Sequence, residues 1–242
     1  QAGSSIGQEK MYKLTDRNGR LLVLRPDNTT PIARVVTTKL NDDVLPLRLY
    51  YMQKVHRASS FHRGHSTEVM QAGAELLGAR GMMADIDILT TAFAALAAVR
   101  GETFRIELSY AAIYKELIQS LNVDAETAER IRSNIENKSY AALGDELEPY
   151  QDREAYRALK AMPNLFGGSE VLDELAGLTD NPGVLKAVAY LKNLIDAITN
   201  AGYGENVMID LGLVQEIDYY TGLMFRGYMG GAGSPVLAGG RY

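Results

Sequence analysis

A cation, an anion and a hydroxyl lie close together near the start of the chain, in the segment Leu-Arg-Pro-Asp-Asn-Thr at residues 24–29. Arg25, Asp27 and Thr29 are residue types that can grip the charged and polar ends of a small ligand. The apolar run at residues 21–25 predicts a short strand, and Pro31 suits the first turn of a helix. Asp, Asn and Thr are also ordinary residues of turns and helix starts, so composition alone favours a structural role.

A second polar group is expected on a strand–loop–strand segment. Residues 47–55 and 69–77 have the composition of two strands, and the residues between them form a polar loop. Strand alternation places Val69, Gln71, Gly73 and Glu75 on one face, which is polar where a core face should be apolar. Such a face can bind a ligand or can simply be hydrated, and by itself the second interpretation is favoured.

Two further segments lie near the end of the chain: Asp-Tyr-Tyr-Thr-Gly at residues 218–222 and Gly-Gly-Arg-Tyr at residues 239–242. Adjacent tyrosines of an extended segment point to opposite faces, so one can pack while the other offers its hydroxyl to a site. Paired glycines allow close approach of the backbone to another group.

The elements that must position these residues change character along the chain. Helical spacing predicts a helix at residues 85–99, and alternation predicts a strand at 104–109. Residues 111–199 are rich in Ala, Glu and Leu and predict four to six helices, and strands return at 207–211 and 223–228. We therefore expect an α+β fold with a core of residues 1–110 and 200–242, interrupted by a helical insertion at 111–199.

Composition narrows the function classes. The 242 residues include 25 Lys and Arg against 30 Asp and Glu, a net charge of −5 that disfavours general nucleic-acid binding. The absence of cysteine excludes disulfides, thiolate metal sites and thiol catalysis, and it suits a reducing cytoplasm. No apolar run approaches the roughly 20 residues that span a bilayer. We expect a cytoplasmic protein with no membrane segment, metal or cofactor, and we expect residues to be missing from both ends of this sequence.

The four segments, in this order, resemble the catalytic domain of histidyl-tRNA synthetase, a class II aminoacyl-tRNA synthetase. That family carries Leu-Arg-Pro-Glu-x-Thr, then an Arg at the end of the motif 2 strand, matched here by Arg57. A Gln and a Gly-x-Glu follow, matched by Gln71, Gly73 and Glu75. After a helical insertion come Leu-Val-Arg-Gly-Leu-Asp-Tyr-Tyr-Thr-Gly and Gly-Gly-Arg-Tyr-Asp. The resemblance spans residues 5–242 and implies an antiparallel sheet flanked by helices.

The resemblance implies that the amino-acid side of the site is kept. Asp27 stands where the family has a Glu that holds the α-amino group of histidine. A carboxylate, an amide and phenols are suitable partners for an ammonium and an imidazole. The positions that match histidine contacts are Asp27, Thr29, Gln71, Glu75, Tyr220 and Tyr242.

The positions that bind ATP in the synthetases depart from the family pattern in this sequence. Arg57 is kept, but Ser59 stands where the synthetases have a Glu that helps to hold ATP. Gln215 replaces the Arg that stabilises charge during adenylate formation, and Glu216 adds an anion beside it. Exchanging a guanidinium for a neutral amide removes electrostatic stabilisation of the transition state. We therefore interpret Arg57, Ser59 and Gln215 as a vestigial nucleotide site and expect no catalytic residues.

This combination is similar to the regulatory subunits of ATP phosphoribosyltransferase. The similarity implies a non-catalytic subunit that binds a short-form catalytic subunit and confers feedback control by histidine on the first step of histidine biosynthesis. It also implies a homodimer within a hetero-oligomer. Whether histidine binds this chain or only the catalytic subunit stays open.

Three alternatives remain beside this hypothesis. The first is a divergent histidyl-tRNA synthetase, and the second is another synthetase-like module, such as a lysyl-lyase-like or kinase-linked sensor domain. The third is a plain α+β domain with coincidental turn motifs, which requires four ordered coincidences.

Overall fold

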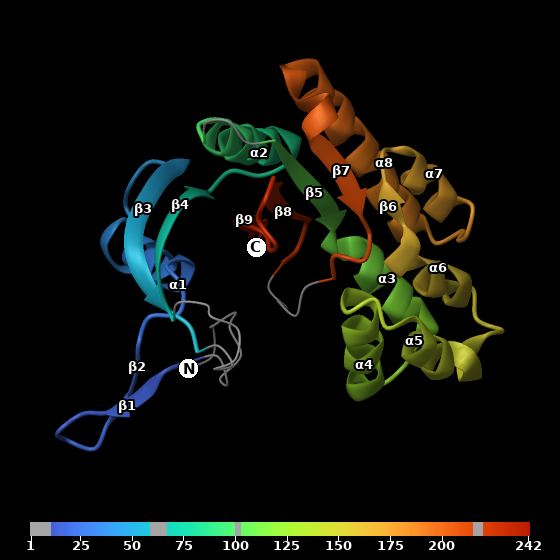
Figure 1. The fold of residues 1–242 in the computed structure, drawn as a ribbon, viewed down its shortest axis with the longest axis horizontal. Helices are drawn as coiled ribbons and strands as arrows, with labels where there is room; N and C mark the ends of the chain where they lie inside the picture. The colour runs from blue at the N-terminus through green and yellow to red at the C-terminus, as the bar shows by residue number, and fades with distance from the viewer. Residues whose placement is uncertain (1–10, 59–66, 100–102, 215–219) are drawn as a thin grey trace. The chain divides into compact units, whose positions relative to one another are not determined.

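The structure is a computed structural model that describes residues 11–58, 67–99, 103–214 and 220–242. The chain divides into two compact units, Gln1–Ala84 and Asp85–Tyr242. Figure 1 shows the course of the chain, and each unit is described below by itself.

The first unit contains two antiparallel strand pairs and one helix. These elements are β1 (Lys13–Thr15), β2 (Leu21–Val23), α1 (Thr29–Lys39), β3 (Leu47–His56) and β4 (Glu68–Leu77). β1 pairs with β2, and β3 pairs with β4 along its full length, with Tyr51 opposite Gly73 and Gln53 opposite Gln71. This long register places the odd-numbered residues of both strands on one face of the ribbon.

The second unit contains a five-stranded sheet in the order β6-β7-β5-β8-β9. Its strands are β5 (Phe104–Tyr110), β6 (Phe166–Gly167), β7 (Val207–Asp210), β8 (Leu223–Met229) and β9 (Leu237–Gly240). β5 and β7 are parallel and the other pairs are antiparallel. The parallel pair arises because the chain leaves β5 and returns to β7 only after a long helical crossover.

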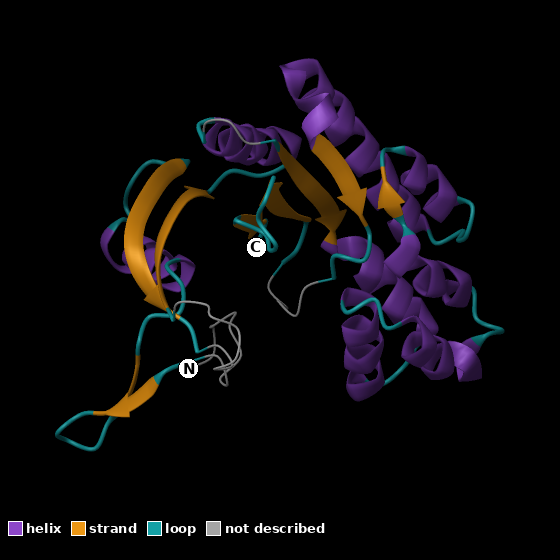
Figure 2. Cartoon of the chain, in the orientation of Figure 1, coloured by secondary structure: helices purple, strands orange, loops and turns teal. Residues whose placement is uncertain are grey.

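Helices make up most of the second unit, and the run between β5 and β7 is almost entirely helical (Figure 2). The α-helices are α2 (Met82–Ala97), α3 (Ala111–Leu121), α4 (Ala125–Glu136), α5 (Tyr140–Leu147), α6 (Ala155–Ala161), α7 (Glu170–Ala176) and α8 (Pro182–Ile198). Short 3-10 turns occupy Glu148–Tyr150, Met162–Asn164 and Gly204–Asn206, and a π-helical turn occupies Thr199–Tyr203. No helix of the described residues is both long and apolar enough to cross a membrane.

One part of the core of the second unit lies where α2 packs on the sheet. The ring of Phe93 on α2 is fully buried and stacks on Tyr203, with ring centroids 4.5 Å apart. Leu96, one turn later, lies against β8 at Gly227, where a Cβ atom would come within 2.9 Å of its side chain. The apolar face of α2 therefore packs directly on the sheet.

The observed elements confirm an α+β fold. The predicted helix at 85–99 forms as α2, and the predicted strands at 104–109, 207–211 and 223–228 form as β5, β7 and β8. The short strands β1, β6 and β9 were not predicted. β1 and β6 each contain one large apolar residue and β9 contains two glycines, whereas the equally short β2 and β7 are recognisable by their apolar runs. The division into a core and an insertion at 111–199 stays a prediction.

Candidate ligand site

The start of α1 is hydrogen-bonded to β4 by two side-chain contacts. Thr29 donates its hydroxyl to Glu75 Oε1 at 2.9 Å, and Asn28 donates Nδ2 to Gln71 Oε1 at 3.0 Å. Gln71 and Glu75 point to the same face because they are four residues apart on a strand. The segment 24–29 therefore contacts the polar face that strand alternation predicted for residues 69–75. The first and second of the motifs singled out in the sequence lie side by side.

Asp27 and Asn28 are buried at this junction, with exposed fractions of 7% and 2%. Asp27 Oδ1 accepts the backbone N–H of Thr30 at 3.1 Å, so its carboxylate binds a first-turn amide of α1. The positive end of the helix dipole also favours a carboxylate there. Asn28 Oδ1 accepts a hydrogen bond of 3.1 Å from Arg25 Nη1.

Tyr51 completes the group from β3. A Cβ atom on Gly73, directly across the ribbon, would lie 2.3 Å from the Tyr51 hydroxyl oxygen, so a larger residue there would displace this ring. Burial raises the pKa of Tyr51 above its ordinary value, and the nearby negative charge of Glu75 raises it further. A hydrogen bond with Thr29 acts in the opposite direction, and Asp27 adds a smaller upward effect. The phenol therefore stays protonated at neutral pH.

The charges of this group suit a cationic ligand with N–H donors. The carboxylates of Glu75 and Asp27 both raise the pKa of Tyr51, and the guanidinium of Arg57 lowers it, so two negative charges and one positive charge act on this phenol. Arg57, at the end of β3, directs its Nε to the carbonyl oxygen of Pro26 at 3.0 Å. An ammonium group with three N–H donors matches carboxylate, amide and hydroxyl oxygens arranged in this way.

The remaining two predicted contacts belong to the second unit. Tyr220 is 8% exposed and packs in a cluster with Ala111, Leu213 and Met224. Its ring lies against Gly240, where a Cβ atom would come within 2.5 Å of Cε1. The close approach expected of the glycine pair is thus observed. Tyr242 is 47% exposed.

The structure therefore brings together four of the six predicted contact residues, Asp27, Thr29, Gln71 and Glu75, within the first unit. Their assignment to histidine stays a prediction, as does that of Tyr220 and Tyr242. Ser59 and Gln215 lie outside the described residues, and their assignment to a vestigial nucleotide site stays a prediction from the sequence.

Comparison with known proteins identifies the family. The histidyl-tRNA synthetase family model matches residues 1–242. The chain belongs to the histidyl-tRNA synthetase family. A relative from Clostridium kluyveri, named ATP phosphoribosyltransferase regulatory subunit, is 40% identical over 242 residues, which cover 99% of this chain and 62% of the relative. A relative of the same name from Clostridium acetobutylicum is 41% identical over 240 residues, covering 98% of this chain and 59% of the relative.

Solved structures agree with this membership of the histidyl-tRNA synthetase family. The crystal structure of an ATP phosphoribosyltransferase regulatory subunit/histidyl-tRNA synthetase from Bacillus halodurans matches with a TM-score of 0.88 and 32% identity. The match covers 99% of this chain and 62% of that one. The fold is therefore the predicted class II synthetase fold, and the chain spans about three fifths of the length of these relatives.

Two residues of the site were not predicted from the sequence. Tyr51 shares its face with the opposing Gly73, and the alternation that selected Gln71 and Glu75 could have selected it once the two strands were paired. Asn28 lies inside the first motif, but nothing in the sequence indicates that its amide contacts Gln71.

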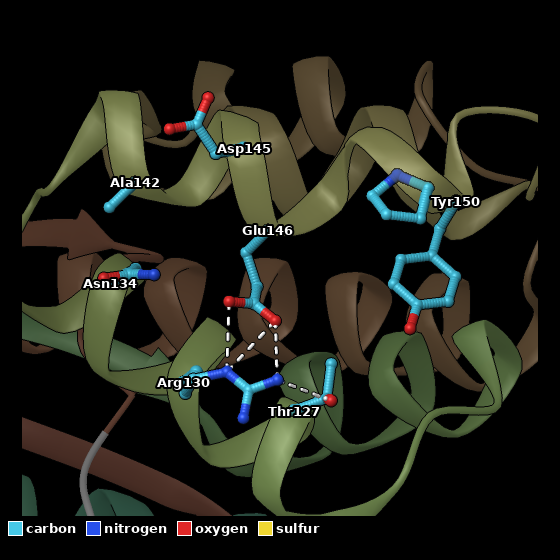
Figure 3. A pocket seen from close by; sticks show the side chains of 8 residues that line it. Thr127, Arg130, Asn134, Ala142, Asp145, Glu146 and Tyr150 are labelled. Carbon is cyan, nitrogen blue, oxygen red and sulfur yellow. Dashed lines mark hydrogen bonds and ion pairs between the residues drawn. The ribbon is translucent and has the colours of Figure 1, made fainter.

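A separate surface cleft lies between α4 and α5 and has a volume of about 400 Å³ (Figure 3). Arg130 lines the cleft and is paired with Glu146 at 2.9 Å and with Glu126 at 3.0 Å. Figure 3 shows the Arg130 guanidinium directed at Glu146 and Thr127. None of the predicted site residues lines this cleft, and its arginine is already neutralised by carboxylates.

Proposed function

We propose that the protein containing this chain is the non-catalytic regulatory subunit of ATP phosphoribosyltransferase, and that it senses histidine. The observation that carries the proposal is the junction of α1 and β4, where Thr29 and Asn28 bind Glu75 and Gln71. These contacts hold the Glu75 carboxylate and the Gln71 amide beside the start of α1, where the Asp27 carboxylate is bound to the Thr30 N–H. Carboxylate and amide oxygens suit the ammonium of an amino acid. The names of the relatives at about 40% identity support the same function.

The ligand of this site would be histidine. Asp27 or Glu75 would accept the α-ammonium, because a hydrogen bond between a carboxylate and a buried cation is worth about 1.5–3 kcal/mol. Gln71 would orient the rest of the ligand without adding charge. The alternative is that the side chains of this junction hydrogen-bond only to one another and bind no ligand, as a remnant of synthetase ancestry.

The chemistry would belong to a partner. Gln215 and Ser59 replace an Arg and a Glu of the synthetase pattern. The lost arginine removes a charge interaction that can contribute several kcal/mol to transition-state stabilisation. The proposed partner is the short-form catalytic subunit, which would join ATP and phosphoribosyl pyrophosphate into phosphoribosyl-ATP and pyrophosphate. The regulatory chain would form a homodimer within this cytoplasmic hetero-oligomer, with no metal, cofactor or nucleic acid of its own.

A divergent histidyl-tRNA synthetase is the second candidate. The retained Arg57, with its guanidinium bound to the Pro26 carbonyl, is the feature that favours it. Aminoacylation requires ATP binding, whereas the regulatory function requires only histidine and the partner chain. The two candidates therefore differ in which ligands the protein must bind.

Size-exclusion chromatography of the full-length protein with a short-form catalytic subunit tests the proposal. We expect one peak that contains both chains and elutes ahead of either chain alone. A catalytic chain that is fully active alone and never co-elutes with this protein would contradict the assignment.

A further inference from the structure

A buried ionic cluster in the second unit is not part of the predicted ligand site. Asp85, near the start of α2, is 4% exposed. Its Oδ2 accepts a hydrogen bond of 2.6 Å from the hydroxyl of Tyr190 on α8 and one of 3.0 Å from Arg241 Nη2. Arg241 Nη2 also lies 3.1 Å from the hydroxyl oxygen of Tyr110, at the end of β5. One guanidinium thus joins the last residues of the chain to two helices and the central strand.

The space around Arg241 is shaped for this side chain. Its guanidinium lies 5.9 Å from the ring centre of Tyr110 and 5.7 Å from that of Tyr190, within the range of cation–π attraction. A Cβ atom on Gly222 would come within 2.4 Å of Arg241 Nε, so a larger residue there would displace the guanidinium. Gly222 and Arg241 therefore form one packed unit, although they come from two different sequence motifs.

Burying the charges of Asp85 and Arg241 costs free energy, which makes this cluster an expensive way to stabilise the fold. Among the described residues, Arg241 Nε is buried without a hydrogen-bond partner. Burial raises the pKa of the Asp85 carboxyl, and the hydrogen bond from Tyr190 and the charge of Arg241 offset this only in part. Well-packed apolar side chains often replace a buried ion pair without loss of stability. The directional contacts of Arg241 therefore call for a function beyond stability.

Backbone hydrogen bonds connect Arg241 to the predicted ligand contacts of this unit. The N–H of Thr221 donates to the carbonyl of Arg241, and the N–H of Arg241 donates to the carbonyl of Leu223, both at 2.8 Å. Tyr220 directly precedes Thr221 in the sequence, and Tyr242 directly follows Arg241. The Tyr220 ring also rests on Gly240, one residue before Arg241. Fixing the Arg241 side chain consequently fixes the backbone beside both tyrosines.

We infer that Asp85, Tyr190 and Arg241 are positioning residues that hold Tyr220 and Tyr242 in place for the ligand. The inference rests on the proposed histidine-binding function. The Arg241 side chain is bound to Asp85, Tyr110 and Tyr190, whereas Tyr242, the next residue, has an exposed fraction of 47%. Tyr220 is held from the other side, because its ring packs on Gly240 and its neighbour Thr221 donates to the Arg241 carbonyl.

The test uses Tyr190→Phe in the full-length protein, a change that removes only the hydroxyl bound to Asp85. Glu146→Gln is the matched control. Glu146 forms an ion pair with Arg130 in the same unit, and it lies outside the predicted site. Histidine affinity is measured by calorimetry, and amide exchange is followed at Thr221 and Arg241. We expect Tyr190→Phe to weaken histidine binding roughly tenfold and to speed exchange at both amides. Glu146→Gln should change neither.

The possible outcomes separate this inference from the proposed function. Normal histidine binding by both the parent and Tyr190→Phe would overturn the positioning role alone, even if exchange at the two amides became faster. Equal weakening by Tyr190→Phe and Glu146→Gln would also overturn it, since any loss of stability would then have the same effect. A parent protein that binds no histidine would contradict the proposed function itself.

Discussion

Thr29 and Glu75 are 46 positions apart in sequence, yet the hydroxyl of Thr29 donates to the carboxylate of Glu75 at 2.9 Å. This hydrogen bond joins the first residue of α1 to the β3–β4 ribbon, where Glu75 pairs with Leu49. Asn28 and Gln71 make a parallel contact beside it. A helix start and a strand face thereby form one polar group that neither could form alone.

The first prediction concerns the charge of Asp27. Asp27→Asn keeps an oxygen that can accept the Thr30 N–H, but it removes the negative charge expected to bind the ammonium of histidine. We expect calorimetry to show affinity for histidine reduced roughly tenfold to a hundredfold, since each factor of ten corresponds to about 1.4 kcal/mol.

Asp16→Asn provides the matched control for this measurement. Asp16 Oδ1 also accepts backbone N–H groups, from Asn18 and Arg20 at 2.8 Å each, but it lies in the β1–β2 turn. This variant should bind histidine like the parent. If Asp27→Asn also binds like the parent, Asp27 does not hold the ammonium.

The second prediction concerns catalysis. Gln215 stands where the synthetase pattern has an Arg, and Ser59 stands where it has a Glu. Because these charges are lost, the pure full-length protein should not exchange pyrophosphate into ATP in the presence of histidine. A genuine histidyl-tRNA synthetase assayed in parallel should show robust exchange. Comparable exchange by this protein would establish it as a synthetase.

The third prediction concerns the start of α8. Asn181 Oδ1 accepts the N–H groups of Gly183 at 2.9 Å and Val184 at 3.1 Å, and Pro182 occupies the first helical position. Asn181→Ala removes this cap and should lower the free energy of unfolding by about 1 kcal/mol in urea denaturation. Asn181→Asp retains the acceptor and should stay close to the parent. Equal losses in both variants would show that the cap is not the cause.

The fourth prediction concerns acid stability. The backbone N–H of Thr127 donates to Asp124 at 2.8 Å and, as the largest cause, lowers the pKa of Asp124 below its ordinary value. A carboxyl with a lowered folded-state pKa stabilises the fold above its unfolded pKa of about 3.9. That contribution is lost as pH falls through the lower folded-state value.

Asp124→Asn tests this linkage because asparagine can cap α4 without titrating. Thermal unfolding followed from about pH 6 to about pH 2 should show a weaker dependence on pH in the variant than in the parent. Superimposable pH profiles would contradict the linkage.

The extent of prediction from sequence differs between the two units. The alternation of β4 was sufficient to place Gln71 and Glu75 on one face, and the glycine pair correctly indicated a close backbone approach at Gly240. The pairing of Arg241 with Asp85 was not predictable, because 156 residues separate them and neither residue type indicates its partner. Long-range polar contacts depend on the tertiary packing, which local periodicity does not encode.

The central claim is that this protein regulates a phosphoribosyltransferase chain in response to histidine. It is tested most directly by assaying phosphoribosyl-ATP formation by a short-form catalytic subunit, with and without the full-length protein and with and without histidine. We expect activity to depend on the added protein and histidine to inhibit the complex, whereas the complex containing Asp27→Asn should stay assembled and resist inhibition. Full activity of the catalytic chain alone, with inhibition by histidine unchanged when this protein is added or mutated, would contradict a regulatory role.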